Sequence, residues 1–112
     1  MPQIDLSSIK PIEMIKGYHA SFIHTAQMTL NFLDIEAGAV VPEHSHPHEQ
    51  VSIVTEGEFE LTVDGEPMRI GPGKVVVIPS NVRHSGLAIT DCKLLDVFTP
   101  VREDYRVLSE KK

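Results

Sequence analysis

The stretch 59–65 constrains the fold most, because it has the pattern of a β-strand that runs into a tight turn. Phe59, Leu61 and Val63 alternate with polar residues, which gives this stretch one apolar face. Asp64-Gly65 follows at once, and an Asp-Gly pair beside an alternating run is a strong hairpin signal. The sequence therefore predicts a β-hairpin with one buried face.

Short runs with strand character recur along the rest of the chain, with Gly and Pro residues between them. They cover residues 18–24, 27–35, 51–55, 75–78, 84–89 and 92–99. No stretch of useful length shows helical periodicity, and the charged residues from Glu103 on are expected to lie over the outside. The pattern predicts an all-β fold, either a sandwich or a small barrel.

The composition fits one ordinary globular domain, with 112 residues of which 41% are apolar and 23% are charged. The formal net charge is −6 and Lys and Arg do not cluster, so neither nucleic acid nor an anionic membrane is an expected partner. A small anionic ligand stays compatible with this charge, since a single arginine can hold a carboxylate.

Features that would indicate export are missing from the sequence. Cys92 is the only cysteine, which excludes an intrachain disulfide. Residues 1–10 lack the basic region and the apolar core of a secretory signal, and no run reaches the length of a membrane span. We expect a soluble, cytoplasmic protein.

Histidines gather at one place in the chain. His44 and His46 stand two positions apart, so on an extended strand their side chains point to the same side. Gln50 shares their parity if Pro47 only bends the strand, and His84 follows in a separate strand. Three imidazoles and one amide oxygen suit Ni, Co, Fe, Mn or Zn. We predict that His44, His46, Gln50 and His84 bind one divalent transition metal.

Other residues near this cluster offer alternatives for the fourth ligand. Glu49 or His48 could replace Gln50, and a carboxylate is a better donor than an amide to a hard cation. We expect His48 to lie at the rim of the site. His19 and His24 each stand alone in a strand, and we interpret them as ordinary structural histidines.

Two spaced motifs around these histidines resemble those of single-domain cupins. The first runs through Gly38, His44-Ser45-His46, Gln50 and Gly57, and the second through Gly73, Pro79-Ser80-Asn81, His84 and Ala88. The resemblance implies a double-stranded β-helix, or jelly-roll barrel, with its core at about residues 18–99 and a C-terminal tail at 103–112. Three positions depart from the motifs. Gln50 replaces Glu, Asn81 replaces Gly and tolerates positive φ almost as well, and Ala88 replaces Asn.

Gln50 together with the segment 96–105 resembles the KdgF-type cupins of pectin and alginate breakdown. That family opens 4,5-unsaturated monouronates, the products of polysaccharide lyases, to linear keto acids. The resemblance implies a small sugar-acid substrate, a metal held by three histidines and a glutamine, and active-site roles for Asp96, Phe98 and Arg102. It also implies a homodimer, in which the apolar residues Ile4, Leu6 and Ile9 could contact the second copy.

Asp96 and Arg102 can each also be interpreted without a function. Asp96 shares a strand face with Cys92, Leu94 and Phe98, where a buried carboxylate costs free energy unless a partner or a cation is near. The alternative is a solvated Asp96 at the barrel mouth. Arg102 could grip a substrate carboxylate with its fork of donors, or form a surface ion pair with Glu103 or Asp104.

Two other function classes fit the same ligand set. Three histidines with open positions can activate oxygen at iron, as in a metal-dependent dioxygenase. A non-catalytic sugar-binding cupin needs no proton donor beside the metal, so the Asp96, Phe98 and Arg102 set argues against it. Fold alone does not decide among these functions.

Overall fold

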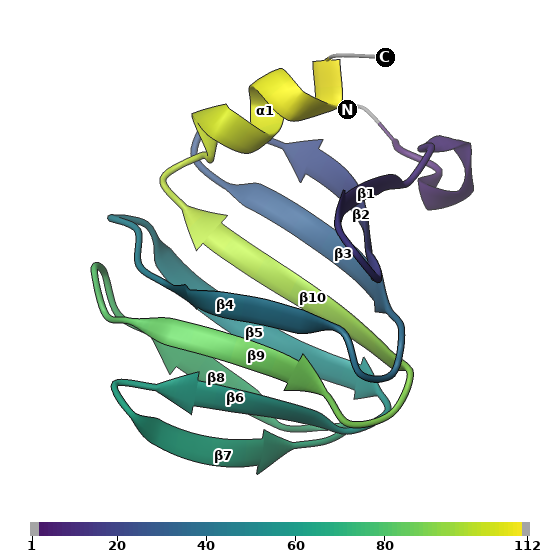
Figure 1. Ribbon diagram of the computed structural model, residues 1–112. Coiled ribbons are helices and arrows are strands. Elements are labelled where there is room, and N and C mark those ends of the chain that lie inside the picture. Colours follow the sequence, from purple (N-terminus) through teal and green to yellow (C-terminus); the bar gives the residue numbers. More distant parts are fainter. Residues whose placement is uncertain (1–2, 111–112) are drawn as a thin grey trace.

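The structure, a computed structural model, describes residues 3–110 and contains ten β-strands, a short 3-10 helix and one α-helix (Figure 1). The strands are β1 (Ile12–Ile15), β2 (Tyr18–His24), β3 (Thr29–Ile35), β4 (Val40–His44), β5 (Glu49–Glu56), β6 (Phe59–Val63), β7 (Glu66–Ile70), β8 (Val75–Ile78), β9 (His84–Ala88) and β10 (Cys92–Thr99). The helices are η1 (Leu6–Ser8) and α1 (Glu103–Glu110).

The strands form two antiparallel sheets that face each other across the core. One sheet has the order β1-β2-β3-β10-β5-β8 and the other β4-β9-β6-β7. The inner faces supply a buried apolar cluster, which comprises Tyr18, Ala20, Phe22, Leu33, Ile35, Val54, Phe59, Leu61, Ile70, Ile78, Ala88, Cys92 and Leu94. The predicted all-β class is confirmed.

The predicted hairpin joins β6 to β7. Val63 pairs with Glu66, so the turn has two residues, Asp64 with φ 50° and Gly65 with φ 80°. Two consecutive residues with positive φ are what a type I′ turn requires, and its twist matches that of the flanking strands.

Gly86 on β9 shows how closely side chains are fitted on the inner face of the four-stranded sheet. Phe59 lies so near that a Cβ at position 86 would stand 2.4 Å from the ring atom Cζ of Phe59. Any larger side chain there would displace the ring or the strand. The glycine therefore leaves room for the Phe59 ring over β9.

The C-terminal segment differs from the prediction, because residues 103–110 form helix α1, whereas the sequence predicted a charged tail and no helix. Glu103 and Asp104 lie in its first turn, where acidic side chains favour a helix N-terminus. Tyr105 and Leu108, three residues apart, pack against the core. Figure 1 shows α1 across one end of the sheets, and it contacts β2. In residues 3–110, no helix has the length and apolar character needed to cross a membrane.

The outward side of the six-stranded sheet carries apolar side chains in two adjacent rows. Strand pairing places them side by side as Ile23, Leu30, Val97, Val51 and Val77 in one row and Phe32, Leu95, Ile53 and Val75 in the next. None of the nine is among the described residues that make up the core cluster or pack against it. We call these nine side chains the outer apolar face.

Candidate metal centre and cavity

Three of the four predicted ligands form one cluster. The side-chain nitrogens of His44, His46 and His84 lie within 4.8 Å of one another and could hold a metal ion. The ring centroids of His44 and His84 are 4.3 Å apart, and those of His46 and His84 are 4.9 Å apart. The convergence that the spacing predicted is present.

The predicted strand geometry behind this convergence is wrong. His44 is the last residue of β4, whereas His46 lies in the loop before β5, and Gln50 lies on β5 itself. An irregularity in β4 orients His44, since Val41 pairs with Gly86 while His44 pairs with His84. Pro42 and Glu43 thus lie opposite Ser85 alone, and two residues opposite one make a β-bulge.

The loop that carries His46 is fixed by a second loop. The backbone N–H of Asn81 donates a 2.8 Å hydrogen bond to the carbonyl oxygen of His46. Asn81 has φ 66°, the left-handed conformation for which the cupin motif ordinarily supplies glycine. The second motif therefore helps to position a histidine of the first.

All three imidazoles are oriented in the same way by the main chain. Nδ1 of His44, His46 and His84 lies 2.8, 3.0 and 2.9 Å from the carbonyl oxygens of Pro42, His48 and Val82. A carbonyl can only accept, so each Nδ1 carries the proton and each Nε2 keeps its lone pair. Nε2 of His84 is buried and has no hydrogen-bond partner in the described chain. A cation is the partner that such a set of lone pairs lacks.

Gln50 adds an oxygen to this set. Its Oε1 lies 3.1 Å from Nε2 of His46, and its Nε2 donates a 3.0 Å hydrogen bond to Ser52 Oγ. The Ser52 bond orients the amide so that the oxygen faces the histidines. Two atoms with lone pairs, Nε2 of His46 and Oε1 of Gln50, then face each other, as two ligands of one ion do. Three nitrogens and one oxygen fit a divalent transition metal.

Burial keeps two of the three imidazoles neutral. Burial lowers the pKa of His84 to about 4, and it also lowers the pKa of His46. Metal ligation requires the neutral imidazole, so both rings are in the binding form near neutral pH.

The two alternative ligands lie apart from the donor cluster. Glu49 is exposed and neighbours Gln50 on β5, so its side chain points to the opposite side of the strand. His48 supplies its backbone carbonyl to His46, and its ring lies edge-on to the His46 ring at 5.6 Å. Neither belongs to the group of three histidines.

A cavity of about 320 Å³ opens beside the cluster, between the two sheets. Most of its wall is apolar. A polar band crosses it from Gln50 through Ser52 to Asp96, since Ser52 Oγ donates a 2.7 Å hydrogen bond to Asp96 Oδ1. Ser52 was not predicted from the sequence, although its inward position between Gln50 and Val54 on β5 was a usable signal.

Asp96 lies on the wall of this cavity and is not solvated at a barrel mouth. Its side chain is buried, and burial raises the pKa of its carboxyl to about 6. Hydrogen bonds from Ser52 and Gln50 and the charge of Arg102 act in the opposite direction. The result is a carboxyl that can both accept and release a proton near neutral pH.

Phe98 also lines the cavity, whereas Arg102 does not. The Phe98 ring centroid is 5.6 Å from that of His46. Arg102 is buried behind Phe98, with its Cζ 4.8 Å from the Phe98 ring and 3.8 Å from the Tyr105 ring. This stacking on Tyr105 was not predicted from the sequence.

The sequence allowed an ion pair of Arg102 with either Glu103 or Asp104, and the structure shows the one with Asp104. Its Nε and Nη2 donate to the two carboxylate oxygens of Asp104 at 3.0 and 2.7 Å, while Glu103 pairs with Arg106. Burial alone would lower the pKa of Arg102, but the bonds to Asp104 raise it overall, so the guanidinium stays charged. Nη1 is buried without a partner among the described residues.

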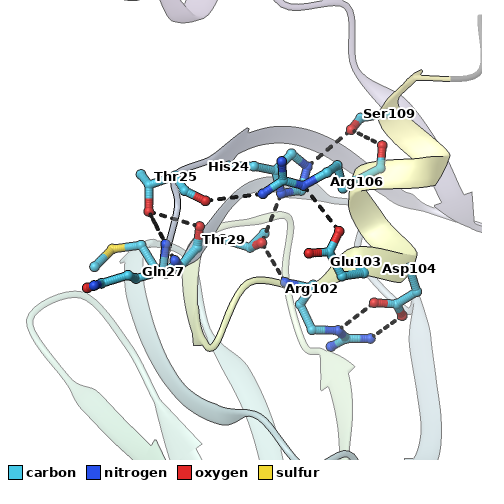
Figure 2. Close-up of polar contacts among 10 residues, drawn as sticks. His24, Thr25, Gln27, Thr29, Arg102, Glu103, Asp104, Arg106 and Ser109 are labelled. Atoms are coloured by element: carbon cyan, nitrogen blue, oxygen red, sulfur yellow. Dashed lines mark hydrogen bonds and ion pairs between the residues drawn. The ribbon is translucent and has the colours of Figure 1, made fainter. Parts of the chain in front are cut away.

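Figure 2 shows how the start of α1 is tied to the β2–β3 turn. The Thr29 hydroxyl accepts a 2.9 Å bond from the Arg102 backbone N–H and lies 2.9 Å from His24 Nδ1. His24 Nε2 lies 3.1 Å from Ser109 Oγ. His24 is therefore a structural histidine that positions the segment carrying Arg102, in line with its interpretation from the sequence.

His19 lies on the surface, with Nε2 2.7 Å from Glu36 Oε2 and 4.0 Å from Glu13 Oε2. These three side chains could also hold a metal ion, but the two carboxylates are exposed. The ion pair with Glu36 accounts for the raised pKa of His19.

The sequence itself places this arrangement in a known family. Residues 31–98 match the family model of the cupin domain, which is more than half of the chain. The chain belongs to the cupin family. This result confirms the barrel class predicted from the two cupin motifs.

Two solved cupin structures are similar over most of the chain. KdgF from Halomonas sp. aligns with a TM-score of 0.84 at 28% identity, covering 88% of this chain and 93% of that one. An RmlC-like cupin from Shewanella frigidimarina NCIMB 400 aligns with a TM-score of 0.84 at 29% identity, covering 88% and 90%.

A curated cupin relative has the same name as the first of these structures. The pectin degradation protein KdgF of Dickeya dadantii (strain 3937) is 30% identical over 70 residues, which are 61% of this chain and 64% of that protein. The chain covers less than two thirds of that relative, and less still of the other curated relatives that it matches. The resemblance to KdgF-type cupins is confirmed.

Proposed function

We propose that this cupin converts 4,5-unsaturated monouronates, the products of pectin or alginate lyases, to linear 4-deoxy-5-keto uronates. The observation that carries the proposal is the position of Asp96, a buried carboxyl on the cavity wall that hydrogen bonds through Ser52 link to Gln50 of the metal centre. The similarity to KdgF proteins supports the choice of substrate.

The proposed metal ligands are His44, His46, Gln50 and His84. A divalent ion bound there would act as a Lewis acid toward substrate oxygens and the departing ring oxygen. The neutral ligand set leaves the charge of the ion undiminished. Which transition metal is native is a question for elemental analysis.

Asp96 is the proposed proton-transfer group. Opening the ring breaks the bond between the anomeric carbon and the ring oxygen as the anomeric hydroxyl loses its proton. The ring oxygen leaves as an enolate, which becomes a ketone when a proton is delivered to C4, so one proton is removed and one is added and the conversion is an isomerisation without an oxidant or a reductant. Asp96 would take the first proton and deliver the second, a role typically worth about 10²–10⁴-fold in rate.

Phe98 and Arg102 are proposed to position the sugar acid. Phe98 would form an apolar wall beside the metal centre. Arg102 lies behind Phe98, with its guanidinium oriented by Asp104 and Tyr105, and its positive charge would attract the substrate carboxylate to this end of the cavity.

We also propose that two copies of the chain associate through the outer apolar face. Val75 and Val77 are 56% and 57% exposed, although they lie beside other apolar side chains. Strand and residue spacings give the two rows an area on the order of 300 Å², which suits the apolar centre of an interface. A stable dimer needs about 800 Å² per partner, so the polar surroundings must also contribute. A second copy offers a flat, uncharged surface of the same kind.

The ring-opening assay tests the function directly. Metal-loaded protein is expected to remove the absorbance of unsaturated galacturonate, and a chelator is expected to stop the reaction. Asp96→Asn should abolish turnover and keep the metal, whereas Asp34→Asn, which changes an exposed aspartate, should be as active as wild type. Full activity in Asp96→Asn would contradict the role of Asp96.

Two measurements distinguish the alternative functions. Oxygen consumption with a candidate substrate would favour a dioxygenase. Binding of uronates without any turnover, in protein with a full complement of metal, would favour a sugar-binding cupin.

A further inference from the structure

Two polar groups on the cavity wall are buried and have no partner. Tyr18 is 4% exposed and Asn31 is 2% exposed, and both line the cavity. The Tyr18 hydroxyl and Asn31 Oδ1 make no hydrogen bond within the described chain. The Asn31 amide nitrogen has only a 3.8 Å contact with the sulfur of Met14. Since buried polar groups are nearly always paired, the partner of these two must lie in the cavity, as water in the free protein or as a ligand that replaces it.

Strand pairing places Asn31 beside the proposed proton-transfer residue, and the Tyr18 hydroxyl approaches the same residue from β2. Asn31 on β3 is the cross-strand neighbour of Asp96 on β10, which in turn neighbours Ser52 on β5. All three face inward, so their side chains adjoin. The charge of Asp96 also contributes, after burial, to the raised pKa of Tyr18, so the phenol lies near the same carboxylate. Tyr18 and Asn31 thus extend the polar band away from the metal centre.

The chemistry of these groups selects among the parts of a ligand. A hydroxyl both donates and accepts, so it can bond to Asn31 Oδ1, to the Asn31 amide and to the Tyr18 hydroxyl. A carboxylate only accepts, and it would meet the negative charge of Asp96. The remaining wall here is apolar, with Leu33 and Leu94 on the same sheet.

We propose that Tyr18 and Asn31 form a subsite that binds ring hydroxyls of the sugar acid. The subsite rests on the proposed function for its substrate class. The subsite would orient the sugar ring so that its hydroxyl-bearing carbons face β2 and β3 while its carboxylate points away from these two strands.

Calorimetry with two probes tests this subsite separately from turnover. D-galacturonate and tetrahydropyran-2-carboxylate share a ring and a carboxylate, but only the first has hydroxyls. Metal-loaded wild type should bind D-galacturonate more tightly than tetrahydropyran-2-carboxylate. Tyr18→Phe and Asn31→Leu should each reduce the ratio of the two affinities by about three- to tenfold, since one hydrogen bond is worth about that much. Leu33→Met, a volume-conserving change on the same wall, should leave the ratio unchanged.

The stability of the free protein distinguishes ligand binding from a structural role. Removing a buried polar atom that has no partner is neutral or stabilising, so neither Tyr18→Phe nor Asn31→Leu should lower the urea midpoint. A lower midpoint with an unchanged affinity ratio would assign both residues to folding and overturn the subsite. Equal binding of both probes by wild type, or no binding of D-galacturonate, would overturn it as well. Lack of turnover on unsaturated galacturonate would instead contradict the proposed function.

Discussion

The Ser52 hydroxyl donates a 2.7 Å hydrogen bond to Asp96 Oδ1 and at the same time accepts a 3.0 Å hydrogen bond from Gln50 Nε2. One small side chain thereby joins a proposed metal ligand to the proposed proton-transfer group. It also decides which atom of the Gln50 amide faces the histidines, because only the nitrogen can donate to Ser52 Oγ when that hydroxyl donates to Asp96.

Ser52→Ala should destabilise the protein. The change removes one acceptor of the buried Gln50 amide nitrogen and one hydrogen bond to the buried Asp96 carboxyl. We expect a loss of about 1–3 kcal/mol in the free energy of unfolding, measured by urea denaturation. Ser21→Ala, on the outward side of β2, serves as the control and should cost less than about 0.5 kcal/mol. Equal effects of the two changes would mean that the Gln50–Ser52–Asp96 chain does not contribute to stability.

His44→Ala should reduce bound metal to well below one ion per chain, because it removes one of three nitrogen donors. His44 is exposed, so the fold should persist. Elemental analysis after dialysis measures the metal content. His24→Ala removes a histidine outside the cluster and should retain full metal content. If His44→Ala and His24→Ala bind the same amount, the ligand set is misassigned.

Arg102→Lys should raise the KM for an unsaturated uronate by about tenfold. Lysine keeps the charge, but it loses the planar fork that bonds Asp104 in two places and stacks on Tyr105. Asp104→Asn should raise the KM by a smaller factor, since the guanidinium loses its orientation but stays in place. Glu103→Gln changes a neighbouring acid that pairs with Arg106 and should have no effect. Steady-state kinetics that show a fall in kcat alone would contradict a binding role for Arg102.

Val75→Lys combined with Val77→Lys should convert a dimer to a monomer, because it places charges on the outer apolar face. Sedimentation equilibrium measures the mass. Val40→Lys is the matched control, since Val40 is 54% exposed but lies on the four-stranded sheet. A wild-type protein that sediments as a monomer would contradict the proposed association.

His24 should make stability depend on pH. Burial, followed by the charge of Arg106, lowers the pKa of folded His24 below the unfolded value of 6.5. The folded state therefore resists protonation, so this contribution to stability is complete above about pH 6.5 and is lost as the pH falls through the lowered pKa. The urea midpoint should decrease when the pH is lowered from about 8 to about 5, and the decrease should be larger for wild type than for His24→Gln. A parallel fall in both proteins would exclude His24 as a source of the dependence.

The sequence predicts most of the strands because their patterns are local. The runs 18–24, 59–63, 75–78 and 92–99 coincide with β2, β6, β8 and β10. Helix α1 was missed because its only two side chains packed on the core, Tyr105 and Leu108, are too few for periodicity. β1 was missed because it has four residues and an irregular register.

The histidines of the candidate site could be predicted from the sequence, whereas the polar residues Ser52, Tyr18 and Asn31 on the cavity wall could not. His44, His46 and His84 stand out by residue type and spacing. Asn31 does not, because on β3 the polar residues Thr29 and Asn31 face the cavity side while Leu30 and Phe32 face outward. This orientation reverses the usual pattern of a strand, in which apolar side chains face the core and polar side chains face outward. Only the pairing of β3 with β10 reveals it.

The carbonyl oxygens that orient the three imidazoles belong to the main chain, and every residue type supplies one. Substitutions at Pro42, His48 or Val82 therefore leave an acceptor in place for each ring. Substitutions around the cluster can then reshape the cavity, and with it the choice of substrate, while the orientation of the three imidazoles persists. Proteins that evolve from this barrel can therefore change their substrate before the arrangement of the three histidines changes.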